Sequence, residues 1–207
     1  MRLLSHSRAS HTGRENQDHI ETRRANNKRL LALADGQGGR EGGALAARLA
    51  LQSALDYLES IPNPDAHTLL TAISVADEAV ETREDAGYST LILLVCQQNQ
   101  IVGASVGDSM TLQITANRSI ELSERQRKNP PLGSGAAVGA QFAVQAQMGD
   151  QILLMSDGVF RFVGLECIER ICRHSDDLAV LPDLLSLQNR SDTGDLPDDW
   201  SAMLLRF

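Results

Sequence analysis

Four apolar segments with the composition of β-strands each carry an aspartate at one edge. The aspartates are Asp35, Asp108, Asp157 and Asp198, in the runs LLALADGQGG, IVGASVGDS, ILLMSDGVF and DDWSAMLLRF. A carboxylate at a strand end is held by a stiff element while its oxygens reach solvent, so several of them could converge on one oxygen-rich cage. Mg²⁺ and Mn²⁺ prefer such ligands. The pattern predicts a strand-rich fold whose strand ends build a site for divalent cations.

A competing interpretation is that these aspartates are only turn residues. Asp-Gly is a common turn dipeptide, and Asp is common at strand exits and helix N-caps. However, Asp35-Gly36 and Asp157-Gly158 both lead into helical patterns. A two-residue hairpin should lead directly into another strand. The context therefore favours a functional role.

The order of strands and helices predicts an α+β fold. Turn clusters at 97–99 and 116–118 separate neighbouring strands so closely that the strands must pair antiparallel. Helical periodicity covers 41–59, 65–84, 159–174 and 176–188. Strands are predicted on both sides of a turn within 19–34, and at 88–96, 101–106, 110–115, 142–147, 152–155 and 200–207. Two pairs of helices should cover the outer faces of one or two antiparallel sheets.

Composition limits the size and the partners of the protein. With 207 residues and 42% apolar content, the chain has enough residues for one sizeable core, so we expect a single domain over 1–207. A net charge of −8 argues against a nucleic-acid partner. Residues 1–40 hold eight Arg or Lys against four acids, so anionic ligands are expected to meet this segment. Within it, the charges around a predicted hairpin turn are interpreted as a solvated face: Arg23, Arg24, Lys28 and Arg29.

The remaining composition points to a cytoplasmic protein. Cys96, Cys167 and Cys172 lack metal-ligand spacing and are interpreted as structural, reduced residues. The sequence MRLLSHSRAS has no apolar signal-peptide core, and the longest apolar run, Leu91 to Cys96, is far short of a membrane span. We therefore expect no contact with a membrane.

Six motifs in order resemble those of the metal-dependent protein phosphatases, the protein phosphatase 2C-like family, in its compact bacterial form. They are GRENQD, ADGQGG, YSTL, VGDS, LLMSDGV and DDWS, between Gly13 and Ser201. The resemblance implies a four-layer αββα sandwich of two antiparallel β-sheets flanked by helix pairs. It also implies a binuclear Mn²⁺ or Mg²⁺ centre that activates water to hydrolyse phosphoserine and phosphothreonine in proteins.

The same resemblance implies the ligands of the metal centre. Asp35 matches the carboxylate that bridges both ions, and Gly36 the residue whose carbonyl is a ligand. Asp157 and Asp198 match the other carboxylates of the first ion. Asp18 matches an acid that acts on the ions through water.

A third ion and the supporting residues are also implied. Asp108 and Asp157 match the pair that holds a weaker third ion in many bacterial members. Ser89, Thr90 and Ser156 match positions that support the site without performing chemistry.

The resemblance further implies a catalytic set of Arg14, Asp18 and Asp35. The family's phosphate-binding arginine lies five residues before the position of Asp18, where this chain has Gly13; Arg14 follows one residue later. We expect Arg14 to bind the phosphoryl group, with Arg8 and Arg40 as other candidates. The irregular segment Ser123–Ala140 is predicted to be a surface loop, shorter than the family's usual flap beside the active site.

Two other functions remain open from the sequence. One is a catalytically weak phosphatase-like domain that binds a phosphoprotein or regulates a kinase. The other is a phosphatase of small phosphorylated metabolites. We expect the partner to be a phosphorylated protein, either a serine/threonine kinase or the target of one. The protein itself is expected to be a monomer.

Overall fold

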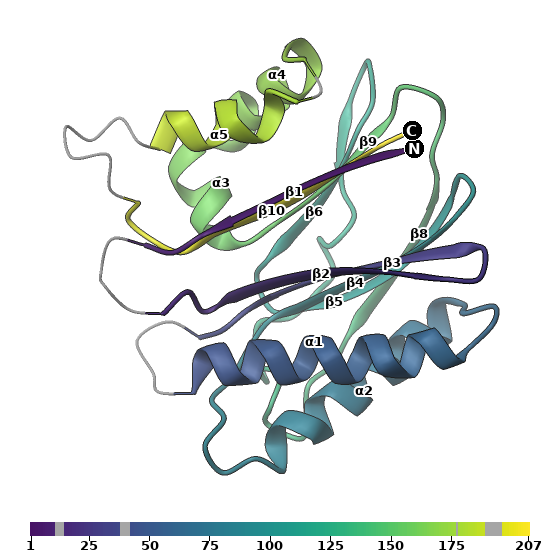
Figure 1. Ribbon diagram of the computed structural model, residues 1–207, viewed down its shortest axis with the longest axis vertical. Coiled ribbons are helices and arrows are strands. Elements are labelled where there is room, and N and C mark those ends of the chain that lie inside the picture. The colour runs from purple at the N-terminus through teal and green to yellow at the C-terminus, as the bar shows by residue number, and fades with distance from the viewer. Residues whose placement is uncertain (11–14, 38–41, 177, 189–195) are drawn as a thin grey trace.

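Two antiparallel sheets lie face to face, with helices on both outer faces (Figure 1). The structure is a computed structural model that describes residues 1–10, 15–37, 42–176, 178–188 and 196–207. Together the layers form the predicted four-layer αββα sandwich. No helix in these ranges is long and apolar enough to span a membrane.

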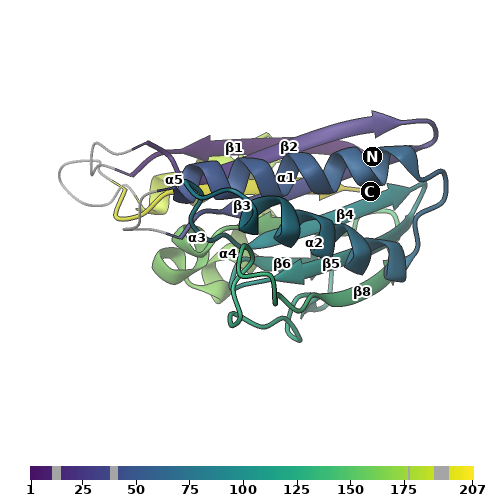
Figure 2. The ribbon, with the colours of Figure 1, turned by 90° about the horizontal axis from the view of Figure 1, so that it is seen from below.

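The first sheet, called here the β3 sheet, has the strand order β2-β3-β4-β5-β8. Its strands are β2 (Asp18–Ala25), β3 (Lys28–Asp35), β4 (Leu91–Gln97), β5 (Gln100–Val106) and β8 (Ala140–Gln145). Two helices cover its outer face, α1 (Gly43–Ser60) and α2 (Ala66–Glu81), as Figure 2 shows from below. The N-cap residue of α2, Asp65, accepts from the backbone N–H of Thr68 at 2.8 Å and completes a capping box.

The second sheet, the β10 sheet, has the order β1-β10-β9-β6-β7. Its strands are β1 (Arg2–Arg8), β10 (Trp200–Arg206), β9 (Gln151–Met155), β6 (Met110–Ile114) and β7 (Ser119–Glu121). Its outer face is covered by α3 (Asp157–Val163), α4 (Leu165–His174) and α5 (Val180–Gln188). The first and last strands of the chain pair along their full length, from Arg2 opposite Arg206 to Arg8 opposite Trp200.

The central strands are buried on both faces, and their side chains alternate between two cores. Along β3, Leu30 and Ala32 pack in the cluster with α1 and α2, whereas Leu31 and Leu33 pack between the sheets. This alternation is the two-residue period of a strand. It explains why the run reads as continuously apolar in the sequence.

Three elements differ from the sequence-based expectations. β1 and β7 were not predicted, because β1 is a largely half-exposed or exposed edge strand and β7 has only three residues. The predicted helix over 159–174 is divided at Gly164, whose φ of +83° interrupts the helical backbone. The β10 sheet therefore carries three helices instead of a pair.

The basic hairpin between β2 and β3 is also different from the predicted solvated face. Lys28 is 2% exposed, and its Nζ donates to the carbonyls of Leu58, at 2.7 Å, and Ile61. A cation there is favourable, because the carbonyls at the C-terminal end of α1 carry partial negative charge. Sequence periodicity could not show that α1 ends beside this hairpin.

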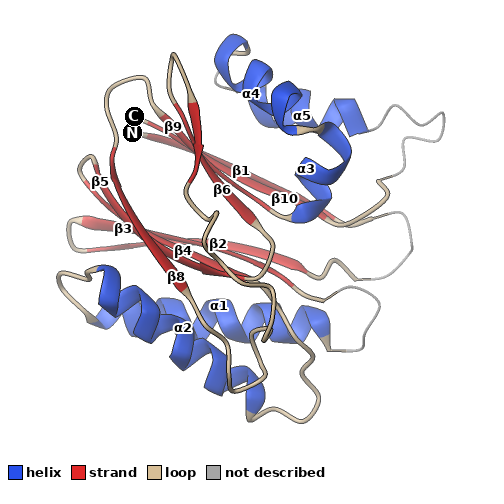
Figure 3. Ribbon diagram, turned by 180° about the vertical axis from the view of Figure 1, so that it is seen from behind, coloured by secondary structure: helices blue, strands red, loops and turns tan. Residues whose placement is uncertain are grey.

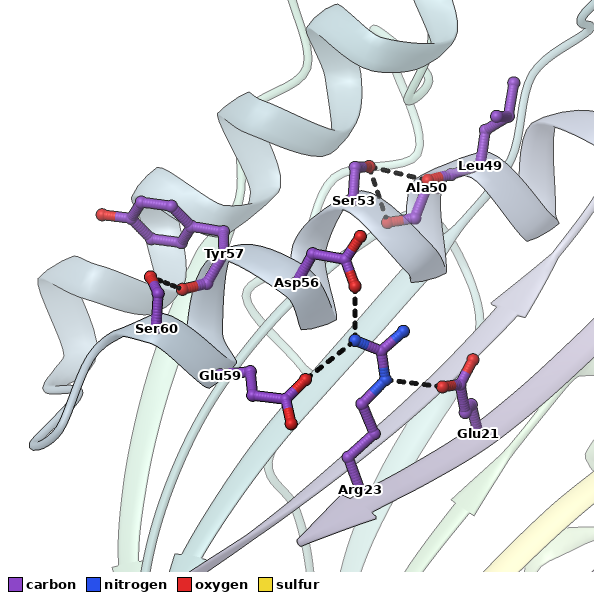
Figure 4. Close-up of polar contacts among 9 residues, drawn as sticks. All are labelled: Glu21, Arg23, Leu49, Ala50, Ser53, Asp56, Tyr57, Glu59 and Ser60. Atoms are coloured by element: carbon purple, nitrogen blue, oxygen red, sulfur yellow. Dashed lines mark hydrogen bonds and ion pairs between the residues drawn. The ribbon is translucent and has the colours of Figure 1, made fainter. Parts of the chain in front are cut away.

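Arg23 ties β2 to the outer surface of α1 (Figure 4). Its Nη1 forms ion pairs with Asp56 and with Glu59 at 3.2 Å, while its Nε lies 2.6 Å from Glu21. The acids lie at least one third exposed, so each pair contributes little to stability. The cluster links β2 to α1 at the surface.

Candidate metal centre

A cavity of about 460 Å³ opens at the end of the sandwich where β2 begins and β3, β5 and β9 end. Carboxylates, two cations and glycine backbone line it together. The charged residues around it are Asp35, Asp108, Lys128, Asp157, Arg161, Asp198 and Asp199. The four aspartates of the strand-end pattern therefore meet in one place.

Asp18 and Asp35 lie directly opposite each other on neighbouring strands. Asp18 is buried, and its Oδ2 accepts a hydrogen bond of 2.7 Å from Ser156 Oγ. Its Oδ1 is buried and has no hydrogen-bond partner within the described ranges. Burial raises the pKa of Asp18 to about 7, with a further contribution from the charge of Asp199.

Asp35 is held by the segment that precedes β4. Its backbone N–H donates to Thr90 Oγ1 at 3.0 Å, and its carbonyl accepts from Thr90 N at 2.8 Å and Ser89 Oγ at 3.0 Å. Burial raises the pKa of Asp35 well above its usual range. Four other carboxylates raise it further: Asp18, Asp157, Asp108 and Asp198. This mutual repulsion is the electrostatic signature of a site that favours bound cations.

Gly36 allows the chain to pass closely beside the start of α1. A Cβ at this position would lie 2.3 Å from the carbonyl oxygen of Gly43, so a side chain does not fit. The N–H of Gly36 donates to the carbonyl of Gln17 at 3.1 Å, which ties the end of β3 to the segment before β2. The backbone of Gly36 thus lines the cavity next to Asp35.

Asp157 follows β9 and opens α3. Burial raises its pKa, the nearby Arg161 lowers it, and Asp108 and Asp198 raise it again. The next residue, Gly158, packs on the segment before β10 that carries Asp198 and Asp199, because a Cβ there would lie 1.9 Å from the carbonyl oxygen of Asp199. The two acidic segments are therefore packed directly against each other.

Asp199 is a residue of the cavity that the sequence reasoning missed. Its Oδ1 accepts from the N–H of Ser10 at 2.7 Å, and its Oδ2 from the N–H of Gln17 at 2.7 Å. It therefore holds the segment between β1 and β2 against the start of β10. Its position beside Asp198 was the only signal available in the sequence.

Asp108 already has two cationic partners. Lys128 Nζ forms an ion pair with Asp108 Oδ2, and Arg161 Nη2 lies 3.3 Å from the same oxygen. Arg161 also places Nη1 2.6 Å from Asp157 Oδ2, so its guanidinium bridges two carboxylates. The sequence reasoning missed both cations, although the spacing of Arg161, four residues after Asp157 on a helix, is one at which side chains meet.

Arg14, predicted to bind the phosphoryl group, lies outside the described residues, as does Arg40. The exposed Arg8 does not line the cavity. Among the described residues, the cations at the cavity come from positions 128 and 161, and not from the basic segment 1–40.

The donor set fits hard divalent cations. Within the described ranges, no three acidic, cysteine or histidine side chains are already placed as a closed cage, so binding an ion would have to draw carboxylates together. The oxygen donors, the partnerless Oδ1 of Asp18 and the repulsion around Asp35 all favour such binding. The residues that could hold ions are Asp18, Asp35, the carbonyl of Gly36, Asp157 and Asp198.

The fold is similar to that of solved bacterial serine/threonine phosphatases. PppA, a regulatory component of T6SS in Pseudomonas aeruginosa, aligns with a TM-score of 0.78 and 22% identity over 99% of this chain and 96% of its own. The catalytic domain of the phosphatase PstP, in complex with two manganese ions, aligns with a TM-score of 0.82 and 20% identity over 98% and 96%. The S. agalactiae serine/threonine phosphatase aligns with a TM-score of 0.83 and 17% identity over 100% of this chain and 99% of its own.

A family model provides the assignment at the level of sequence. The model described as protein phosphatase 2C matches residues 7–190, and the chain therefore belongs to the protein phosphatase 2C family. No curated protein matches the chain. The family predicted from the sequence motifs is thus confirmed.

Proposed function

We propose that this chain hydrolyses phosphoserine and phosphothreonine in proteins with the help of two divalent cations, Mn²⁺ or Mg²⁺. The observation that carries the proposal is that carboxylates from the end of β3, the turn after β5, the start of α3 and the segment before β10 converge on one cavity in a protein phosphatase 2C fold. Each carboxylate is positioned by a different part of the sandwich. Such an arrangement has no structural purpose without cations, because the carboxylates repel one another.

Each residue has a distinct part in the proposed centre. Asp35, the Gly36 carbonyl, Asp157 and Asp198 would hold the ions. Asp18 would accept a hydrogen bond from a water at the centre through its partnerless Oδ1. Only two ions are included, because Asp108 already pairs with Lys128 and Arg161.

The ions would supply the positive charge and the acidified water that hydrolysis of a phosphate dianion requires near neutral pH. The chain itself fixes the positions of the donors. Ser156 orients Asp18, Thr90 orients the backbone of Asp35, and Gly158 lets α3 approach the start of β10.

The deciding experiment is release of inorganic phosphate from a phosphoserine or phosphothreonine peptide, with excess chelator and then with Mn²⁺ or Mg²⁺. We expect no release in chelator and restored release with either ion. Full activity in chelator would contradict the metal mechanism. Peptide binding without release would support the phosphatase-like binding domain, and higher kcat/KM for sugar phosphates than for phosphopeptides would support the metabolite phosphatase.

A further inference from the structure

Lys128 and Arg161 come from distant parts of the chain and meet at one carboxylate. Lys128 lies in the connection between β7 and β8, which crosses from the β10 sheet to the β3 sheet (Figure 3). Arg161 lies on α3, four residues after Asp157. Both side chains contact Asp108 Oδ2, and both line the cavity with Asp35 and Asp198.

The backbone beside Lys128 is fixed to the turn that carries Asp108. Gln126 Nε2 donates to the carbonyl of Ser109 at 2.6 Å, and the N–H of Gly107 donates to the carbonyl of Arg127 at 3.0 Å. These bonds enclose Asp108 on both sides. The backbone next to Lys128 is therefore held beside Asp108.

Among the described residues, the charge at the cavity favours a role for Lys128 and Arg161 in binding an anionic substrate. Six carboxylates gather there: Asp18, Asp35, Asp108, Asp157, Asp198 and Asp199. Counted over the described residues, these carboxylates and two divalent cations would sum to −6 + 4 = −2, which weakens the attraction for a phosphate dianion. The positive charges of Lys128 and Arg161 bring this formal charge at the cavity to −2 + 2 = 0.

The same two side chains are free to turn toward a ligand. The side chain of Lys128 is 59% exposed and that of Arg161 is 49% exposed. Ion pairs at such exposure contribute only about 0–1 kcal/mol, so exchanging a carboxylate oxygen for a phosphoryl oxygen costs little. The planar fork of Arg161, which already spans two carboxylates, suits two oxygens of one phosphoryl group.

We propose that Lys128 and Arg161 form the phosphoryl-binding pair of this cleft and that Asp108 is the residue that positions them. This proposal rests on the proposed function, whose reaction requires a bound phosphomonoester. It assigns to Asp108 a role different from the third-ion ligand implied by the sequence resemblance. Both residues that are proposed to bind the phosphoryl group lie in the described part of the chain.

The test is a calorimetric titration of inorganic phosphate into the Mn²⁺-loaded protein, together with kcat and KM for a phosphopeptide. In Lys128→Ala and Arg161→Ala, we expect the phosphate Kd and the KM each to rise on the order of tenfold, as for loss of a charged hydrogen-bonding partner. The Mn²⁺ concentration for half-maximal binding should not change. Lys128→Arg should restore phosphate binding, whereas Arg161→Lys should restore it only in part.

Arg127→Ala is the matched control, because Arg127 is the exposed neighbour of Lys128 on the same loop and does not line the cavity. It should bind phosphate as the wild type does. Unchanged phosphate Kd in both alanine variants, with melting temperatures that show folded protein, would overturn the pair and leave the proposed function intact. Absence of Mn²⁺-dependent phosphate release in the wild type would overturn the proposed function, and the phosphate titration would still decide on the pair.

Asp108→Asn separates the two possible roles of that residue. If Asp108 positions the cations, the phosphate Kd and KM rise while the half-maximal Mn²⁺ concentration stays the same. If the Mn²⁺ requirement rises instead and phosphate binding at saturating Mn²⁺ is unchanged, Asp108 is an ion ligand and the positioning role is wrong.

Discussion

At the scale of single residues, the site depends on glycine positions at which the neighbouring backbone leaves no room for a side chain. A Cβ on Gly158 would meet the carbonyl oxygen of Asp199 at 1.9 Å, and this oxygen belongs to rigid backbone beside Asp198. In Gly158→Ala, the segment with Asp198 must therefore move. We expect weaker Mn²⁺ binding by calorimetry and a loss of stability of about 1–3 kcal/mol, typical of overpacking.

Gly149→Ala provides the comparison for this prediction. Gly149 has a φ of +92°, but no atom lies within 4 Å of its Cβ position, so the substitution adds backbone strain without crowding. It should lower the melting temperature and leave Mn²⁺ binding unchanged. Wild-type Mn²⁺ affinity in Gly158→Ala would mean that the contact between α3 and β10 does not shape the centre.

The charged ligands give a second prediction at this scale. Asp35→Asn and Asp157→Asn keep the size of the side chain but remove a charge from the centre. Measured at saturating Mn²⁺, kcat should fall by several orders of magnitude, because transition-state charge depends on the ions that these residues are proposed to hold. Asp85→Asn, on the exposed surface away from the cavity, should have wild-type kinetics. Small and equal losses in all three variants would indicate that Asp35 and Asp157 are turn residues.

At the scale of elements, one buried carboxylate anchors the loop between β7 and β8. Asp77 on α2 accepts from the N–H groups of Gly133 at 2.6 Å, Gly135 at 3.3 Å and Ala137 at 3.0 Å. Asp77→Ala leaves these donors without their acceptor, at a cost of about 1–3 kcal/mol for each group that stays buried. We expect a lower urea midpoint together with a higher KM, because the same loop carries Lys128.

A matched variant distinguishes anchoring from a general loss of helix stability. Glu78→Ala removes the acidic side chain next to Asp77 on the solvent side of α2, where Glu78 is exposed. It should leave both the urea midpoint and KM nearly unchanged. If Asp77→Ala lowers stability but keeps the wild-type KM, the loop does not position residues at the cavity.

The elements also show what the sequence could and could not predict. Strand and helix periodicity located β2 to β6, α1 and α2 to within a few residues, because their apolar faces are continuous and well separated by turns. The break at Gly164 was not predicted, since one glycine is compatible with either a helix or its end. Lys128 and Arg161 were missed because their meeting at Asp108 depends on how two sheets and a loop pack, which no local pattern contains.

At the scale of the whole molecule, the acidic cavity links stability to pH and metal. The pKa of Asp18 rises from 3.8 to about 7 on folding, so the folded state binds more protons than the unfolded state between these values. The contribution of Asp18 to the free energy of unfolding is therefore fully present below about pH 4 and is lost as the pH rises to about 7. Bound Mn²⁺ should compensate, because an ion that binds only the folded state stabilises it.

Urea unfolding in chelator at pH 5 and pH 7 measures this contribution directly. The wild type should lose more stability across this interval than Asp18→Asn, which cannot titrate at that position. Mn²⁺ should raise the stability of the wild type at pH 7. Identical pH dependence in the two proteins would show that Asp18 is not buried as a protonated acid in the metal-free fold.

The pairing of β1 with β10 has a consequence for how the protein is made. All strands of the β3 sheet lie between residues 18 and 145, so that sheet and its two helices can assemble while synthesis continues. The β10 sheet joins a strand from the start of the chain to the last strand described, and Asp198 and Asp199 arrive only with that strand. A nascent chain on the ribosome thus carries half of its fold and only part of its carboxylates. The proposed capacity to hold ions is therefore acquired only after β10 has left the exit tunnel.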